Sequence, residues 1–201
     1  MIDDVNEEEL IVKAQNGDVR AFSEIVEIYQ ERAIRIAQGF VGNLEDARDL
    51  SQEAFVKCYE GLVSFKAESK FYTWFYRILA NTCKDFLRKK KTRKPLFGWL
   101  AQDNDDESEE NVYDRVVAKT PSAPQELVNR ELGDRIMEKI GELPLQQRMV
   151  FSLRYLDGLS LDEIAQSMSL SVGAVKAHLW QAGQKMKKGL GSFAKEGQSG
   201  G

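Results

Sequence analysis

An acidic segment from about Pro95 to Ala123 limits what this chain can fold into. Six acidic residues stand between positions 103 and 110, and the segment has little apolar periodicity. Like charges repel and apolar side chains are scarce, so we expect no packed core there. The segment therefore divides the chain into two parts. The ranges we predict are a first domain at 1–94, an acidic flexible linker at 95–124, a second domain at 125–190 and a Gly/Ser-rich disordered tail at 191–201.

Both domains carry helical apolar patterns. Neither has the strict apolar/polar alternation or the Val, Ile and Thr clusters that are typical of strands. The pattern predicts helices near 7–15, 18–39, 44–63, 71–91, 125–141, 145–156, 160–168 and 172–189. The fold class that we predict is all-α, with two small helical domains joined by the acidic linker.

The net charge of −4 over 201 residues hides an uneven distribution. Residues 95–134 carry 3 basic and 10 acidic residues, a net charge of −7, whereas 1–94 are neutral and 135–201 carry +3. The acidity therefore belongs to the middle of the chain. Local basic patches in the two domains keep nucleic-acid binding open.

Several function classes find no support in the sequence. No apolar run approaches the roughly 18 residues that cross a bilayer, and the acidic N-terminus lacks the features of a signal peptide, so we expect a cytoplasmic protein. Two cysteines, Cys58 and Cys83, and one histidine are too few for a zinc site. No phosphate-binding glycine motif is present. We therefore expect no metal, no cofactor and no enzymatic activity.

The segment 71–94 is the richest in chemistry. On a helix its apolar stripe lies opposite a polar face that carries Arg77, Asn81, Lys84 and Arg88, with Trp74 at the border. Cations neutralise phosphates, an Asn amide reads a base edge, and an aromatic ring stacks on an unpaired base. The combination favours DNA that is being opened into single strands; the alternative is an amphipathic helix with a solvated charged face.

A second DNA-binding signal lies at 159–188. Ala165, Ser169 and Val175 occupy the small, turn and packing positions of a helix-turn-helix, and Ser160 with Glu163 fits a capping box. Ser171 is placed to cap the second helix. The residues that we expect to face outward on that helix are Ala174, Ala177, His178, Gln181, Lys185 and Lys188. An ordinary helical hairpin is the alternative.

These blocks, in this order, resemble the extracytoplasmic-function (ECF) type of bacterial sigma factor. EDARDLSQEAFVK at 45–57 is similar to the polymerase-binding part of region two, and FYTWFYRILANTCKDFLRK at 71–89 to its promoter-melting part. LPLQQRMVFSLRYLDGLSLDEIAQSMSLSVGAVKAHL at 143–179 resembles region four, which reads the minus-thirty-five element. The resemblance implies an alternative sigma factor that lends promoter specificity to RNA polymerase, as in stress responses.

The resemblance also implies roles for individual residues. Those that match the segment docking on the polymerase β′ coiled coil are Asp46, Asp49, Gln52 and Glu53. Those implied at the minus-ten element are Trp74, Arg77, Asn81, Lys84 and Arg88, with the loop 64–70 receiving a flipped base. Those implied at the minus-thirty-five element are Ser171, Ala174, Lys176, Ala177, His178, Gln181 and Lys185. The implied partners are core RNA polymerase through its β′ and β subunits, promoter DNA and an anti-sigma factor.

The second helix departs from the family pattern, which often has Thr, Ser and several Arg there. Ala174, Ala177, His178, Gln181 and Gly183 stand instead, and fewer cations predict weak duplex binding by this domain alone. The same segment also resembles the helix-turn-helix of quorum-sensing regulators. A regulator that does not act through core polymerase is therefore the alternative function, although residues 1–94 show no receiver pattern.

Overall fold

A computed structural model of the chain describes residues 4–93 and 123–196, with side chains placed within 7–91 and 132–190. The described residues form helices joined by short turns, without strands. The elements are α1 (Asp4–Gln15), α2 (Val19–Val41), α3 (Leu44–Gly61), the 3₁₀ turn η1 (Leu62–Ser64), α4 (Phe71–Arg93), α5 (Ala123–Glu142), α6 (Leu145–Tyr155), α7 (Leu161–Met168) and α8 (Val172–Glu196). The all-α prediction is confirmed.

Local caps explain where the helices begin and end. The Asp18 side chain accepts hydrogen bonds from two backbone amides at the start of α2, and Asn43 accepts one from Asp46 at the start of α3. Gly42 ends α2 at φ +86°, a left-handed conformation that glycine adopts without a steric cost. Ser160 and Glu163 form the capping box of α7 that the sequence predicts. The chain therefore turns sharply at each cap and brings successive helices together.

The first part of the chain is built around an aromatic core between α2, α3 and α4. Phe75 is fully buried and stacks on Phe55 of α3, with ring centroids 4.5 Å apart. Tyr29 of α2 lies 5.5 Å from the ring of Phe71. Such ring pairs contribute about 0.5–1.5 kcal/mol beyond the area that they bury. They fix α3 and α4 as one body.

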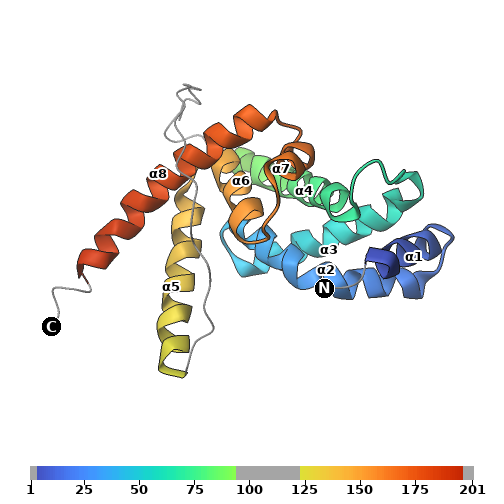
Figure 1. The fold of residues 1–201 in the computed structure, drawn as a ribbon, viewed down its shortest axis with the longest axis horizontal. Coiled ribbons are helices and arrows are strands. Elements are labelled where there is room, and N and C mark those ends of the chain that lie inside the picture. The colour runs from blue at the N-terminus through green and yellow to red at the C-terminus, as the bar shows by residue number, and fades with distance from the viewer. Residues whose placement is uncertain (1–3, 94–122, 197–201) are drawn as a thin grey trace.

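The second part contains the helix-turn-helix, α7 and α8. Ser169 ends α7 at φ +56°, and Val175 of α8 packs back into the core with no exposed surface. A smaller apolar cluster joins α5 to α8 through Ile140, Leu143, Ala182 and Met186. In Figure 1, α5 and α8 extend away from the body formed by the other helices.

The two parts pack directly on each other. One continuous apolar cluster runs from α1 to α4 into α6, α7 and the start of α8. Helix α7 lies against α4, and α6 lies against α2 (Figure 1). Helices α2 and α6 cross closely at Gly39, where an added Cβ would stand 2.3 Å from Ser152 Oγ. Beside this crossing, Arg32 of α2 pairs at 3.0 Å with Asp157, whose side chain is 4% exposed. We call this contact between α2–α4 and α6–α7 the seam.

The predicted linker and tail fall largely outside the described residues. Residues 94–122 and 197–201 are not described, and the structure has 191–196 as a continuation of α8. The apolar pattern predicts the end of α8 near 189. Leu190 packs against the cluster between α5 and α8, which extends the helix past Gly189. Among the described helices, none is long and apolar enough to span a membrane.

The close crossing at Gly39 allows a direct test of the seam. An added Cβ at Gly39 would lie 3.0 Å from Ser152 Cβ, about half an ångström below the lower end of the separations found in disulfides. We expect the pair Gly39→Cys and Ser152→Cys to form an intramolecular disulfide in the full chain on mild oxidation. Non-reducing electrophoresis and intact mass measure it.

The native cysteines are poor competitors, because burial raises the pKa of both Cys58 and Cys83 to about 12 and leaves few thiolates. Gly133→Cys with Ser152→Cys is the matched control, since nothing lies within 4 Å of a Cβ at Gly133. Equal cross-linking of the two pairs would contradict a populated seam.

Candidate nucleic-acid interface

Helix α4 presents one polar face along its length. Arg77, Asn81 and Arg88 are exposed, and Lys84 is half-buried. Burial lowers the pKa of the Lys84 ammonium from its usual value. Arg88 pairs with Asp85 at 3.1 Å on the exposed flank. The polar residues that the sequence predicts for this face are therefore brought together, with Asn81 between the cations.

Trp74 is half-buried at the border of that face. Its ring lies 5.0 Å from Phe65 and 5.9 Å from Phe71, and Gly61 leaves the space that its six-membered ring occupies. The ring is thus held rigidly, with part of its surface open to solvent. A rigid, partly exposed indole at the edge of a cationic face is suited to stacking on a base.

The loop between η1 and α4 is tied to α1. The side-chain amide of Gln15 donates hydrogen bonds to the carbonyls of Leu62 and Phe65, at 3.1 and 2.8 Å. Ala67 in the loop has φ +56°, which is uncommon for a residue other than glycine. The role of Gln15 could not be predicted, because nothing in its local pattern indicates contacts with residues 47 and 50 positions away.

Helix α7 covers the first turns of the polar face of α4. Thr73 is 1% exposed, and its carbonyl accepts a hydrogen bond from Ser167 Oγ at 3.2 Å. The Arg77 Nε donates to the carbonyl of Gln166 at 3.2 Å. Thr73 stands opposite the apolar stripe of α4, yet it is buried because the second part of the chain packs there. From Arg77 onward the polar side chains of this face are exposed or half-buried, although Arg77 Nε is bonded to α7.

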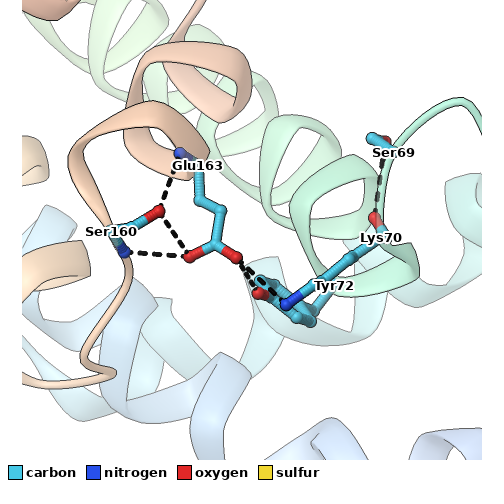
Figure 2. Close-up of polar contacts among 5 residues, drawn as sticks. All are labelled: Ser69, Lys70, Tyr72, Ser160 and Glu163. Carbon is cyan, nitrogen blue, oxygen red and sulfur yellow. Dashed lines mark hydrogen bonds and ion pairs between the residues drawn. The ribbon is translucent and has the colours of Figure 1, made fainter. Parts of the chain in front are cut away.

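Glu163 of α7 is the centre of the polar contacts across the seam (Figure 2). Its carboxylate accepts hydrogen bonds from the Tyr72 hydroxyl and from Ser160 N at 2.9 Å, and it pairs with Lys70 Nζ at 3.4 Å. Partial burial alone would raise the pKa of Glu163. The hydrogen bonds from Tyr72, Ser160 and Lys70 outweigh burial and lower the pKa to about 2. Glu163 is therefore an anion at neutral pH.

The outer face of α3 is acidic and open. Asp49, Gln52 and Glu53 are exposed, and Glu53 pairs with Lys57 at 2.6 Å. Asp46 lies on the same side of α3 as Asp49 and Glu53 but is less exposed: it accepts a hydrogen bond from Asn43, and Lys90 of α4 reaches it at 2.9 Å. These two hydrogen bonds lower the pKa of Asp46. Three of the four predicted residues are thus exposed, and the fourth is tied to the end of α4.

The residues predicted at the minus-thirty-five element fall into three groups. Ser171, Lys176 and Ala177 are exposed, and Ser171 Oγ accepts the Ala174 amide as the predicted cap. Ala174 and His178 are half-buried. Gln181 and Lys185 turn toward α6, where Gln147 donates to Gln181 at 2.6 Å and accepts from Lys185 at 3.0 Å.

Burial shows which side of α8 faces solvent. Val175, Leu179, Ala182 and Met186 form the buried stripe. At 100° per residue, the positions opposite that stripe are Gly173, Ala177, Trp180, Gln184 and Lys188, and all of them are exposed. Trp180 is 38% exposed and was not among the predicted residues. The signal in the sequence that could have identified Trp180 is an aromatic residue within an otherwise polar helix face.

Two family models match the chain. Sigma-70 region 2 matches residues 25–93, which include α3 and α4, and Sigma-70 region 4 matches residues 133–186, which include the helix-turn-helix. Relatives match along nearly the whole chain. The ECF RNA polymerase sigma factor SigW of Bacillus subtilis is 34% identical over 90% of this chain and 94% of its own. The ECF RNA polymerase sigma-E factor of Escherichia coli is 36% identical over 90% and 93%.

The fold has counterparts among solved structures. CnrH, in a complex with the cytosolic domain of CnrY, is similar with a TM-score of 0.64, and the match covers 93% of this chain and 98% of that one at 22% identity. The sigma factor RpoE of Bartonella quintana, in a complex with the anti-sigma factor NepR, gives a TM-score of 0.63 at 19% identity over 86% and 98% of the two chains. With regions two and four both matched and relatives of this identity, the chain belongs to the ECF sigma factors of the sigma-70 family.

Proposed function

We propose that the chain is an alternative sigma factor that binds core RNA polymerase in the cytoplasm and directs promoter-specific transcription initiation. The observation that carries the proposal is the pairing of a cationic, Asn-bearing face on α4 with a helix-turn-helix in one chain of this family. The family consists of transcription factors that carry no catalytic site of their own, and we assign none to this chain. Membership of the sigma-70 family also favours a sigma factor over a helix-turn-helix regulator that does not act through core polymerase.

We assign polymerase binding to the open face of α3. Asp49, Gln52 and Glu53 offer carboxylates and an amide on a rigid helix, which suits a basic or polar coiled coil such as that of the β′ subunit. Asp46 is assigned a supporting role, because its bond to Lys90 links this face to the end of α4. The β subunit is the expected second contact in the polymerase.

We assign the minus-ten element to α4. Arg77, Lys84 and Arg88 supply phosphate contacts, Asn81 is placed to hydrogen-bond a base edge, and Trp74 is placed to stack on an unpaired base. Because α7 covers the first turns of this face, the arrangement described above belongs to the chain without promoter DNA.

We assign the minus-thirty-five element to the solvent side of α8. Ser171, Ala174, Lys176 and Ala177 lie near its N-terminal end, which enters the major groove in helix-turn-helix proteins. We add Trp180 to this set, because its exposed ring offers an apolar contact to a thymine methyl group. His178, Gln181 and Lys185 lie at the flank that faces α6. An anti-sigma factor remains a proposed partner, by family membership.

Core binding is the experiment that tests the proposal. We expect the full chain to retain purified core RNA polymerase in a pull-down at sub-micromolar concentration. The variant Asp49→Arg, Glu53→Arg should lose at least tenfold in affinity, because two attractive charges become repulsive ones, about 1.4 kcal/mol or more.

The matched control is Glu24→Arg, Glu27→Arg, which makes the same change of charge on exposed positions of α2. Polymerase binding that is equal in both double variants would contradict the assignment to α3. No binding by the unaltered chain would contradict the sigma-factor function itself.

The assignment of Trp180 has its own test. On a template selected by run-off transcription with the unaltered chain, we expect Trp180→Ala to lower promoter output roughly tenfold, about 1.4 kcal/mol, through the loss of an apolar base contact. Its thermal unfolding should change much less than its promoter output, because the side chain is 38% exposed and lies opposite the buried stripe of α8. Tyr155→Ala, which truncates a 51% exposed aromatic residue on α6, is the control. Undiminished output with Trp180→Ala would contradict the contact.

A further inference from the structure

A carboxylate occupies a small anion-binding arrangement at the beginning of α4. Lys70 and Tyr72 direct an ammonium group and a hydroxyl at the same oxygen of Glu163 (Figure 2). The Lys70 ammonium also lies 5.4 Å from the centre of the Tyr72 ring, so the two side chains hold each other in place. A cation and a hydroxyl that converge on one anionic oxygen are also the groups that bind a phosphate.

The same edge continues along α4 to Arg77. Its Nε donates to the Gln166 carbonyl, one turn further along α7 than Glu163. Helix α7 therefore supplies two oxygens, one charged and one neutral, to two donors on α4, Tyr72 and Arg77, and to Lys70 directly before it. None of these oxygens is available to α4 once α7 moves away.

Promoter geometry requires that movement. The names of the minus-ten and minus-thirty-five elements give their positions, which differ by about 25 base pairs. That separation is roughly 85 Å along B-form DNA. In the closed chain α4 packs directly on α7 of the helix-turn-helix. If α4 reads one element and α8 the other, as proposed above, the seam must be open on a promoter. Lys70, Tyr72 and Arg77 then lose their partners beside a DNA strand.

We propose that Lys70, Tyr72 and Arg77 form a binding edge for the backbone phosphates of the opened promoter strand, and that Glu163 and Gln166 occupy this edge in the closed chain as an internal competitor. The inference rests on the proposed function, since it uses the same helix for the same strand. It adds Tyr72 to the residues that the family resemblance implies at the minus-ten element, and it gives Lys70, the last residue of the loop 64–70, a contact with the strand backbone.

Glu163 is suited to be a competitor that can be displaced. The capping box holds its other oxygen at Ser160, and this bond persists whether or not the seam is closed. Displacement by DNA therefore exchanges one anion for another on Lys70 and Tyr72, while α7 keeps its cap. Phosphate oxygens replace the Glu163 oxygen on Lys70 and Tyr72, and the fold of α7 does not depend on these contacts across the seam.

The test uses the full chain, a fluorescein-labelled single-stranded DNA pool of random 12-mers, and anisotropy titrations between 50 and 200 mM salt. Glu163→Gln removes the anion, while the Gln side-chain oxygen still accepts from Ser160. We expect this variant to bind the DNA at least threefold more tightly than the unaltered chain. Asp162→Asn is the matched control, because it removes one exposed carboxylate from the same turn of α7.

A second comparison identifies the phosphate contact. For single strands, each phosphate contact contributes about 0.7 to the slope of log K against log salt. Lys70→Gln should therefore lower the slope by about 0.7 in the Glu163→Gln background, where the edge is open. It should change the slope much less in the unaltered chain, where Glu163 occupies Lys70. Tyr72→Phe in the open background should weaken binding without changing the slope.

Two outcomes overturn the inference: Glu163→Gln binds no more tightly than Asp162→Asn, or Lys70→Gln leaves the slope of the open background unchanged.

If Glu163→Gln does not fold, the disulfide pair at Gly39 and Ser152 provides the same test. The oxidised, closed chain must then bind the 12-mers more weakly than its reduced form, and equal binding overturns the inference. Core polymerase binding through α3 is measured separately, so its failure would remove the proposed function without deciding the strand-binding result.

Discussion

The packing of α4 on two sides is the constraint on which the rest of the structure depends. Its apolar face is locked against α2 and α3 by Phe71, Phe75 and Leu79, which are at most 2% exposed. Its polar face meets α7 through Tyr72 and Arg77. Because the apolar cluster continues into α6 and α7, separation of the two parts exposes apolar surface as well as polar groups. A closed chain is therefore the state to expect without a partner, and the free energy of binding to polymerase and DNA must offset the opening.

Rigid packing between α3 and α4 also relates the two proposed binding surfaces. The ring stack of Phe55 on Phe75 and the ion pair of Lys90 with Asp46 join the helices along their lengths. A polymerase subunit that binds the acidic side of α3 thereby fixes where the cationic side of α4 lies. Acidic residues thus lie on α3 and cationic residues on α4 of the same body. This separation explains how a chain with a net charge of −4 can present a cationic surface to DNA.

Local features were predictable from the sequence, and tertiary ones were not. Helix positions, the Ser160–Glu163 capping box and the turn at Ser169 follow from patterns within a few residues, and all are present. The buried stripe of α8 follows from its apolar pattern, whereas the hydrogen bonds that Gln147 on α6 makes with Gln181 and Lys185 were not predictable. Burial of Thr73 likewise depends on a contact with Ser167, 94 residues away. No periodicity within α4 carries information about a helix that packs on it from another part of the chain.

Glu163 both caps α7 and contacts Tyr72 and Lys70, so it links the stability of α7 to the seam. An isolated ion pair across the seam would contribute little, because Lys70 is 69% exposed and surface pairs are worth about 0–1 kcal/mol. Glu163 is different, since Ser160 already holds its side chain and little further side-chain entropy is lost when it meets Tyr72 and Lys70. Fixing a carboxylate through one helix cap makes it a better acceptor for the neighbouring helix. The contact therefore adds to the apolar packing of the seam when no DNA is present, and its two donors, Lys70 and Tyr72, can also bind a phosphate.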